Sequence, residues 1–392
     1  MSFSLTKFAS DSNPRAAASS PMGSHSHHLS ILSLLLFMFV SVSEQTRTAV
    51  QSKQGIHHKH NFRPTSIFVF GDSYADTGNS LKGKSSAWKA PYGTTYPGKP
   101  AGRFSDGRVL TDFVVTEGEG VDAATYLGLK SPEPFGTRKT MAENVKRGMN
   151  FAFGGAGVFD ADIGAPNVST QIDNLEQMIK HKVYTSEDLT NSVALVSVAG
   201  NDYAHYVATS GSFEGLPSFI ASVVNQTSWD LMRIHELGVK RIVVSALQPL
   251  GCLPVITYFF SLNRCYDAFN TFAILHNRLL NQSLLRLNRI TRRHNQYSPT
   301  FLLLDLYAAF TSVLSHPSTY NIPQLFKPCC LGANSSYSCA SVDDNHVKRY
   351  SVCDNPKSAL FWDSVHPSDA GWHAVYTKLR TLRSFQQLRT IP

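Results

Sequence analysis

Four short apolar runs most tightly limit the fold that this chain can adopt. They are rich in β-branched and aromatic side chains, and they are apolar throughout rather than at alternate positions. The runs are residues 66–70, 192–198, 241–246 and 301–306. Continuously apolar strands are typical of a parallel sheet that is buried on both faces, whereas a β-sandwich favours alternation.

Helical patterns lie between these predicted strands, most clearly over residues 219–237 and 267–294. Strands that alternate with helices predict an α/β fold with helices on both sides of the sheet. No internal repeat or Pro- or Ser-rich linker divides residues 65–388. We therefore expect one large α/β domain over this range.

The N-terminal region resembles a secretory leader. Residues 29–42 form a 14-residue apolar run, which is short for a membrane span, and Ser41 and Ser43 suit cleavage before Glu44. We interpret residues 1–43 as a signal peptide, with Met22 as a possible internal start, and residues 44–64 as a flexible linker. An organelle transit peptide is the alternative, because residues 1–28 contain a single acid, Asp11.

Glycosylation sequons and cysteines also favour secretion. The four N-x-S/T sequons begin at Asn167, Asn225, Asn281 and Asn334. The six cysteines are candidates for disulfides and comprise Cys252, Cys265, Cys329, Cys330, Cys339 and Cys353. Cys252 and Cys265 bracket one loop, whereas the other four allow two plausible pairings. A zinc site is the less favoured alternative, because no C-x-x-C motif occurs.

The net charge of +8 does not point to nucleic acid, because the 36 Lys and Arg residues are scattered and form no basic run. We interpret the charge as a general attraction to anionic surfaces. No second hydrophobic segment reaches 18 residues, so we expect no integral membrane segment in the mature chain.

Three segments carry residues suited to acyl-transfer chemistry. Ser73 follows the first predicted strand, where it could present its hydroxyl as a nucleophile or could simply form a turn. Asp363 precedes His366 by three residues, so a tight turn would let the carboxylate orient the imidazole. Gly155 and Asn201 could supply oxyanion donors, although a turn glycine and a strand cap are the plain alternatives.

In this order along the chain, the motifs around Ser73, Gly155, Asn201 and His366 resemble the GDSL (SGNH) esterase/lipase family, and its plant branch above all. They are FGDS at 70–73, NFAFGGAG at 150–157, GNDY at 200–203 and DSVHP at 363–367. The segments GRFSDGR at 102–108 and QPLGCLP at 248–254 strengthen the resemblance, which covers about residues 66–385.

The resemblance implies a three-layer α/β/α sandwich of the SGNH-hydrolase, flavodoxin-like type, with a parallel sheet of about five strands. By position it assigns the nucleophile to Ser73, the general base to His366 and its orienting partner to Asp363. It assigns the oxyanion donors to Ser73, Gly155 and Asn201, and it requires no cofactor or metal.

Two positions depart from the family pattern: Tyr74 replaces a leucine, and Ala199 replaces a glycine. Both lie outside the assigned triad and donors, so we expect changed packing rather than lost chemistry. We interpret Asp72 and Asp202 as residues that brace loops.

We therefore expect a secreted, monomeric serine esterase or lipase, extracellular in the cell wall or alternatively vacuolar. Its substrate would be a small-molecule or polymer-borne ester, and aromatic segments at 88–96 and 258–260 are candidates to line the pocket. A secreted acyltransferase with the same acyl-enzyme and a non-catalytic binding protein are the alternatives.

Overall fold

The computed structural model describes residues 63–115, 127–138, 145–162, 164–292 and 299–387. The predicted signal peptide at 1–43, the possible start at Met22 and the linker as far as residue 62 lie outside the described residues.

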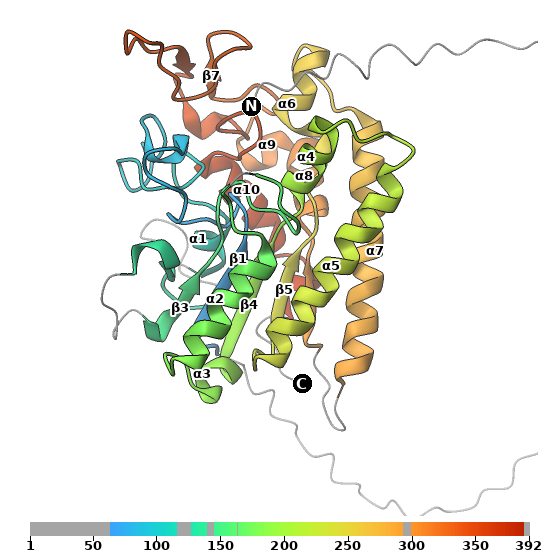
Figure 1. Ribbon diagram of the computed structural model, residues 1–392. Coiled ribbons are helices and arrows are strands. Elements are labelled where there is room, and N and C mark those ends of the chain that lie inside the picture. Colours follow the sequence, from blue (N-terminus) through green and yellow to red (C-terminus); the bar gives the residue numbers. More distant parts are fainter. Residues whose placement is uncertain (1–62, 116–126, 139–144, 163, 293–298, 388–392) are drawn as a thin grey trace, which may run out of the picture. The chain divides into compact units, whose positions relative to one another are not determined.

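A parallel sheet of six strands forms the centre of the fold (Figure 1). The strands are β1 (Ser66–Gly71), β2 (Glu133–Pro134), β3 (Gly148–Asn150), β4 (Ser192–Ser197), β5 (Ile242–Ser245) and β6 (Phe301–Leu304). Their order across the sheet is β2-β3-β1-β4-β5-β6, and every pairing is parallel. The predicted α/β/α architecture is confirmed, with six strands where about five were expected.

The four apolar runs became β1, β4, β5 and β6, whereas β2 and β3 were not predicted. These two strands contain two and three residues, which is too short for a hydrophobic pattern to stand out. β3 begins at Gly148, whose φ of +90° and closeness to the backbone of Ile67 leave no room for a side chain.

Helices cover both faces of the sheet. They are α1 (Leu110–Val115), α2 (Val168–Lys180), α3 (Ser186–Thr190), α4 (Gly200–Ala208), α5 (Leu216–Glu236), α6 (Pro254–Thr257), α7 (Asp267–Thr291), α8 (Leu306–Ser315), α9 (Pro317–Tyr320), α10 (Asp369–Leu379) and α11 (Arg383–Gln386). Short 3₁₀ turns are η2 (Ser86–Trp88), η3 (Phe135–Thr137), η4 (Val145–Arg147), η5 (Leu250–Cys252), η6 (Tyr258–Phe260) and η7 (Pro356–Ser358). The two long predicted helices correspond to α5 and α7.

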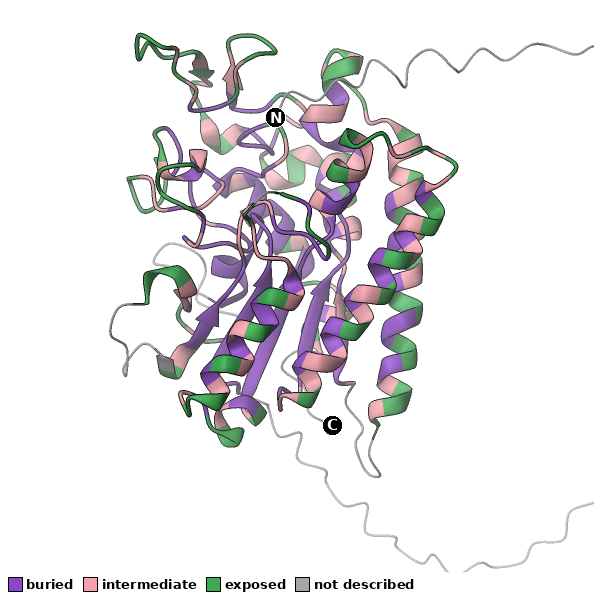
Figure 2. Ribbon diagram, in the orientation of Figure 1, coloured by how far each residue is buried: buried purple, intermediate pink, exposed green. Residues whose placement is uncertain are grey.

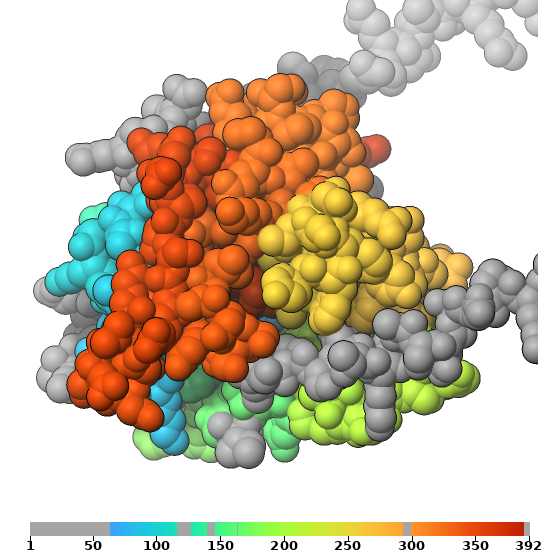
Figure 3. All heavy atoms as spheres, turned by 90° about the horizontal axis from the view of Figure 1, so that it is seen from above, coloured from blue at the N-terminus to red at the C-terminus, as the bar shows by residue number. Residues whose placement is uncertain are grey.

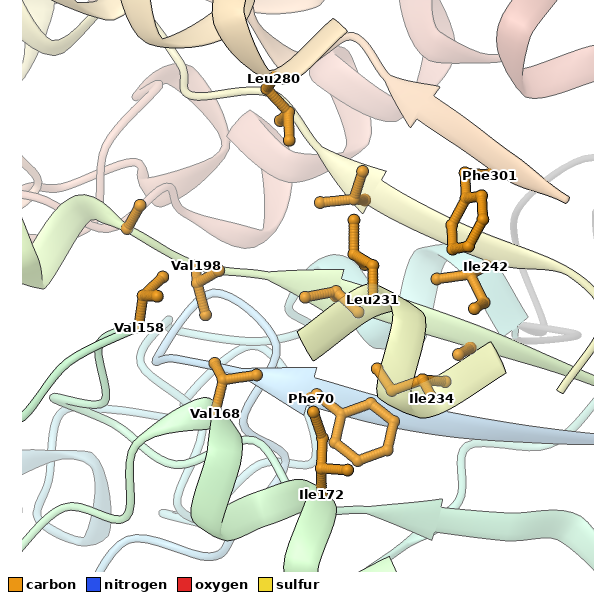
Figure 4. Packing of buried hydrophobic residues seen from close by; sticks show 14 of the residues in the cluster. Phe70, Val158, Val168, Ile172, Val198, Leu231, Ile234, Ile242, Leu280 and Phe301 are labelled. Atoms are coloured by element: carbon orange, nitrogen blue, oxygen red, sulfur yellow. The ribbon is translucent and has the colours of Figure 1, made fainter. Parts of the chain in front are cut away.

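Successive residues of β1 point into two different hydrophobic cores. Ile67 and Val69 pack with α1, α8, α10 and α11, whereas Phe68 and Phe70 pack with α2, α3, α5 and α7. Figure 4 shows the second core, in which Phe70 lies close to Ile172 of α2. Strands β1, β4 and β5 are wholly buried (Figure 2), which explains why their sequences are apolar on both faces rather than at alternate positions.

Three disulfides join the six cysteines. Cys252 pairs with Cys265, and the open choice in the second cluster is resolved as Cys329–Cys353 and Cys330–Cys339. The second cluster includes the hairpin of β7 (Cys330–Gly332) and β8 (Tyr350–Val352), and we call residues 329–353 the disulfide lobe. Its cysteines pack against Trp362, next to the predicted site.

None of the helices in the described ranges is long and apolar enough to cross a membrane.

Candidate active site

Ser73 lies just beyond the carboxyl end of β1, as predicted. The strand ends at Gly71, where an added Cβ would approach the carbonyl oxygen of Ser197 to 2.0 Å. The buried side chain of Gln171 holds this end of the strand: it accepts a hydrogen bond from Gly71 N–H at 2.7 Å and donates to Gly71 C=O at 2.9 Å. Sequence analysis missed Gln171, because a glutamine within an amphipathic helix carries no distinctive signal.

Asp363 and His366 lie in the tight turn that their spacing suggested. Trp362 N–H donates to His366 C=O at 2.7 Å, and Phe361 and Pro367 form an antiparallel bridge. The Asp363 carboxylate accepts backbone hydrogen bonds from Val365 and His366, at 3.0 and 2.8 Å. The backbone of the turn therefore holds the carboxylate independently of its contact with the imidazole.

Ser73, His366 and Asp363 form one continuous hydrogen-bonded chain. Nε2 of His366 lies 2.8 Å from Oγ of Ser73, and Nδ1 lies 2.9 and 2.8 Å from the two oxygens of Asp363. All three residues are at most 9% exposed. Burial by itself would raise the pKa of Asp363, but the adjacent imidazole and the donors on the carboxylate bring it below its ordinary value.

Two backbone N–H groups beside the Ser73 hydroxyl are candidate oxyanion donors. Within the described residues, neither Ser73 N–H nor Gly155 N–H has a hydrogen-bond partner. Gly155 has a φ of +89°, and an added Cβ would meet the Asp162 carboxylate at 2.8 Å, so a glycine is needed here. N–H groups that have no partner within the described protein suit the stabilisation of a developing negative charge.

The loops that carry Ser73 and Gly155 are joined by two buried polar side chains, Asp76 and Asn150, and by the partly buried Asn79. The Asp76 carboxylate accepts from Gly154 N–H at 2.9 Å, and also from Gly78, Asn79 and Ser80. Asn79 donates to the carbonyls of Asn150 and Ala152, and Asn150 donates to Ala75 C=O. Sequence analysis assigned no role to these residues, although Asp76 and Asn79 follow Ser73 closely.

Asn201 lies in the first turn of α4. Its amide donates to Ala156 C=O at 2.8 Å, which holds Asn201 beside the Gly155 loop. Asp202 accepts from the N–H groups of Val158 and Phe159, both at 2.9 Å, as expected of a loop brace. Burial raises the pKa of Asp202 to about 6, although these donors oppose the shift.

Ala199, which precedes α4, has a φ of +94°. This is the position at which the family pattern has glycine, and a residue with a Cβ is strained in that conformation. The departure at Ala199 is therefore tolerated at a cost in backbone strain.

The departure at Tyr74 creates a polar link. The Tyr74 hydroxyl donates to Val365 C=O at 2.7 Å and accepts from Gln248 at 3.1 Å. It therefore joins the Ser73 segment to the turn of His366. Asp72, whose carboxylate accepts from Tyr74 N–H at 3.0 Å, acts as a brace within the same loop. Burial raises the pKa of Asp72 to about 7, against the opposing effect of that N–H.

The two aromatic segments expected to line a pocket differ in how far their side chains are buried. In segment 88–96, Tyr92 is buried and contacts Asp363, whereas Tyr96 is exposed. Segment 258–260 is η6, where Tyr258 and Phe259 are exposed, and it follows α6, whose Val255 N–H donates to Ser364 C=O at 2.9 Å. Seen from above, the yellow α6–η6 segment and the orange-red disulfide lobe flank a hollow (Figure 3).

Among the described residues, no group of three or more His, Cys, Asp or Glu side chains is arranged to hold a metal ion.

A parallel sheet with a Ser–His–Asp chain at its carboxyl edge has the arrangement that serine hydrolases use. The model of the GDSL-like lipase/acylhydrolase family matches residues 67–379. Among curated proteins, the GDSL esterase/lipase At5g03610 of Arabidopsis thaliana is 47% identical over 353 residues, covering 88% of this chain and 94% of that protein. The GDSL esterase/lipase At3g09930 of the same plant is 45% identical over 357 residues, covering 89% and 96%.

Among solved structures, an alpha/beta hydrolase enzyme from the metagenome of Lake Arreo, Spain, is 14% identical and covers 83% of this chain and 96% of its own. Its TM-score is 0.35. This chain belongs to the GDSL-like lipase/acylhydrolase family, and it is a carboxylic ester hydrolase.

Proposed function

We propose that this protein is a secreted serine esterase or lipase that acts through Ser73, His366 and Asp363. The observation that carries the proposal is the 2.8 Å approach of His366 Nε2 to Ser73 Oγ, with Asp363 bound to the opposite nitrogen. This is the arrangement that a general base needs in order to remove a hydroxyl proton.

The reaction is a double displacement. Ser73 Oγ attacks the ester carbonyl while His366 Nε2 takes its proton, and the carbonyl oxygen becomes an oxyanion. When that intermediate collapses, His366 gives the proton to the leaving alcohol, and the acyl group stays on Ser73. Water then attacks the acyl group, His366 takes its proton, and the carboxylic acid leaves as Ser73 regains a proton.

The oxyanion would be held by Ser73 N–H, Gly155 N–H and the side-chain amide of Asn201. Support comes from the two N–H groups without partners and from the hydrogen bond that keeps Asn201 beside Ala156. Loops held by Asp76 and Asp202 fix these donors before substrate arrives, so little reorganisation is required during the reaction.

Secretion is supported by the leader-like residues 1–43, the three disulfides and the positions of the sequons. Asn225, Asn281 and Asn334 are exposed. Asn167 is partly buried, caps α2 through Thr170 N–H and donates to Asp160. We therefore expect glycans at the three exposed sites rather than at Asn167, which peptide mapping of secreted protein would test.

An acyltransferase would use the same acyl-enzyme and pass the acyl group to an alcohol instead of water. Nothing in the triad distinguishes the two reactions, so product analysis with an added acceptor alcohol is the relevant test. A non-catalytic binding protein is disfavoured by the intact hydrogen-bonded chain from Ser73 to Asp363.

Hydrolysis of p-nitrophenyl acetate, butyrate and palmitate by wild type and Ser73→Ala tests the proposal. We expect activity in the wild type alone, and the trend with acyl length separates a short-chain esterase from a lipase. Equal hydrolysis by both proteins would contradict the role of Ser73.

A further inference from the structure

The Asp363 carboxylate has a donor that lies outside its own turn. The Tyr92 hydroxyl donates to Oδ2 of Asp363 at 2.7 Å, across a sequence separation of 271 residues. The same oxygen accepts from Nδ1 of His366 at 2.8 Å. Oδ1 is occupied by the backbone of Val365 and His366, so Tyr92 completes the set of donors around the carboxylate.

Tyr92 is held firmly in this position. It is 3% exposed, and its ring packs edge-on against Trp362 and Phe104, with centroids 6.0 and 6.5 Å apart. Tyr92 belongs to the same buried cluster as the cysteines of the disulfide lobe. The Tyr92 hydroxyl therefore cannot easily leave Asp363.

We propose that Tyr92 is a positioning residue that acts through Asp363, fixing the rotation of its carboxylate and sharing its negative charge. The proposal rests on the proposed function, because it assigns to Asp363 the orientation of His366. Among the described residues, Tyr92 has no hydrogen bond or ring contact with Ser73, so we expect its effect on the reaction to pass through the hydrogen bond at Oδ2.

The shared charge has a defined consequence for pH dependence. A carboxylate with one fewer donor keeps more charge on Oδ2, and that charge attracts the protonated imidazole of His366 more strongly. The imidazole would then keep its proton to higher pH and become an effective base only there. The other titratable groups described near His366 or Asp363 are Asp72 and Tyr74, and neither is changed by a substitution at Tyr92.

The test is Tyr92→Phe, measured as kcat/KM for p-nitrophenyl acetate across pH 5–9. We expect the plateau value of kcat/KM to fall about tenfold or less. The acid limb, which is the part of the profile where kcat/KM rises with pH, should move to higher pH by roughly half a unit. Combined with Asp363→Asn, which removes the charge that Tyr92 shares, the substitution should have little further effect.

Tyr203→Phe is the matched control. It also removes a buried tyrosine hydroxyl from a 2.7 Å hydrogen bond, in this case to Nδ1 of His276. A general loss of packing or stability would lower the thermal midpoint of both variants, whereas only Tyr92→Phe should displace the acid limb.

An unmoved acid limb in Tyr92→Phe would overturn the proposal, and so would an equal loss in the wild-type and Asp363→Asn backgrounds. Failure of the proposed function itself gives a different result, because Ser73→Ala would then stay as active as the wild type. The two failures can therefore be told apart with the same assay.

Discussion

The carboxylate of Asp76 accepts a hydrogen bond from the backbone N–H of Gly154 at 2.9 Å. This contact joins the loop after β1, which carries Ser73, to the loop after β3, which carries Gly155. Asp76 is fully buried and accepts from Gly78, Asn79 and Ser80 as well. One side chain thus holds both candidate sources of oxyanion N–H groups.

Asp76→Asn should impair both stability and catalysis. The asparagine side chain has only one acceptor oxygen. Its N–H₂ group would face the N–H groups of Gly154 and Ser80, which are donors too, so buried donors would be left unpaired. We expect the free energy of unfolding to fall by about 1–3 kcal/mol and kcat to fall as the Gly155 loop shifts. Urea unfolding and initial rates measure the two effects.

Asp173→Asn is the control for this substitution. Asp173 pairs with Arg233 on the surface, and its side chain is 58% exposed. Because exposed ion pairs contribute little, this variant should keep wild-type stability and kcat. Similar behaviour of the two variants would contradict the role given to Asp76.

Ala199→Gly should stabilise the protein. Ala199 has a φ of +94°, where glycine avoids the steric cost of a Cβ. Part of the gain is lost because glycine is more flexible when unfolded, so we expect a net gain of up to about 1 kcal/mol. The same exchange at Ala204, which lies inside the helix α4, should instead destabilise the protein by about 1 kcal/mol. A loss of stability at both positions would contradict the strain at Ala199.

The sequence predicted the layers of the fold because strands that are buried on both faces leave continuous apolar runs. It predicted the turn from Asp363 to His366 because a spacing of three residues limits the geometry. It could not predict the roles of Gln171, Asp76 or Tyr92, because each depends on a partner that is distant in the sequence. Asp76 and Gly154 are 78 residues apart, and Tyr92 and Asp363 are 271 residues apart. Single buried polar residues leave no periodic signal, and only the fold shows which loops they join.

Asn201→Ala tests the side-chain donor of the proposed oxyanion hole. Loss of one such donor lowers kcat by about 10²–10³-fold, with a smaller effect on KM because the bond strengthens in the transition state. Asn167→Ala is the control: it removes the α2 cap and should cost about 1 kcal/mol of stability without changing kcat. An unchanged kcat in Asn201→Ala would remove Asn201 from the mechanism.

His276 should make the protein less stable in acid. Burial lowers the pKa of His276 to about 3, whereas an unfolded histidine titrates near 6.5. Between these values the unfolded chain binds a proton that the folded protein does not. The contribution of neutral His276 to the free energy of unfolding is therefore complete above pH 6.5. It is lost as pH falls toward 3, at about 1.4 kcal/mol per pH unit.

His276→Gln removes this titration and should flatten the dependence of unfolding free energy on pH between 6 and 4. Urea unfolding at pH 4, 5, 6 and 7 measures the slope for both proteins. His181, which is exposed on the surface, provides the matching control as His181→Gln, whose slope should equal that of the wild type. Equal slopes for wild type and His276→Gln would contradict a buried, neutral His276.

The most direct test of the account is to treat the secreted protein with a fluorophosphonate and locate the adduct by peptide mass spectrometry. We predict a single adduct on Ser73, lost in Ser73→Ala and formed far more slowly in His366→Ala, because the imidazole activates that hydroxyl. An adduct on another residue, or none on folded wild-type protein, would contradict Ser73 as the nucleophile.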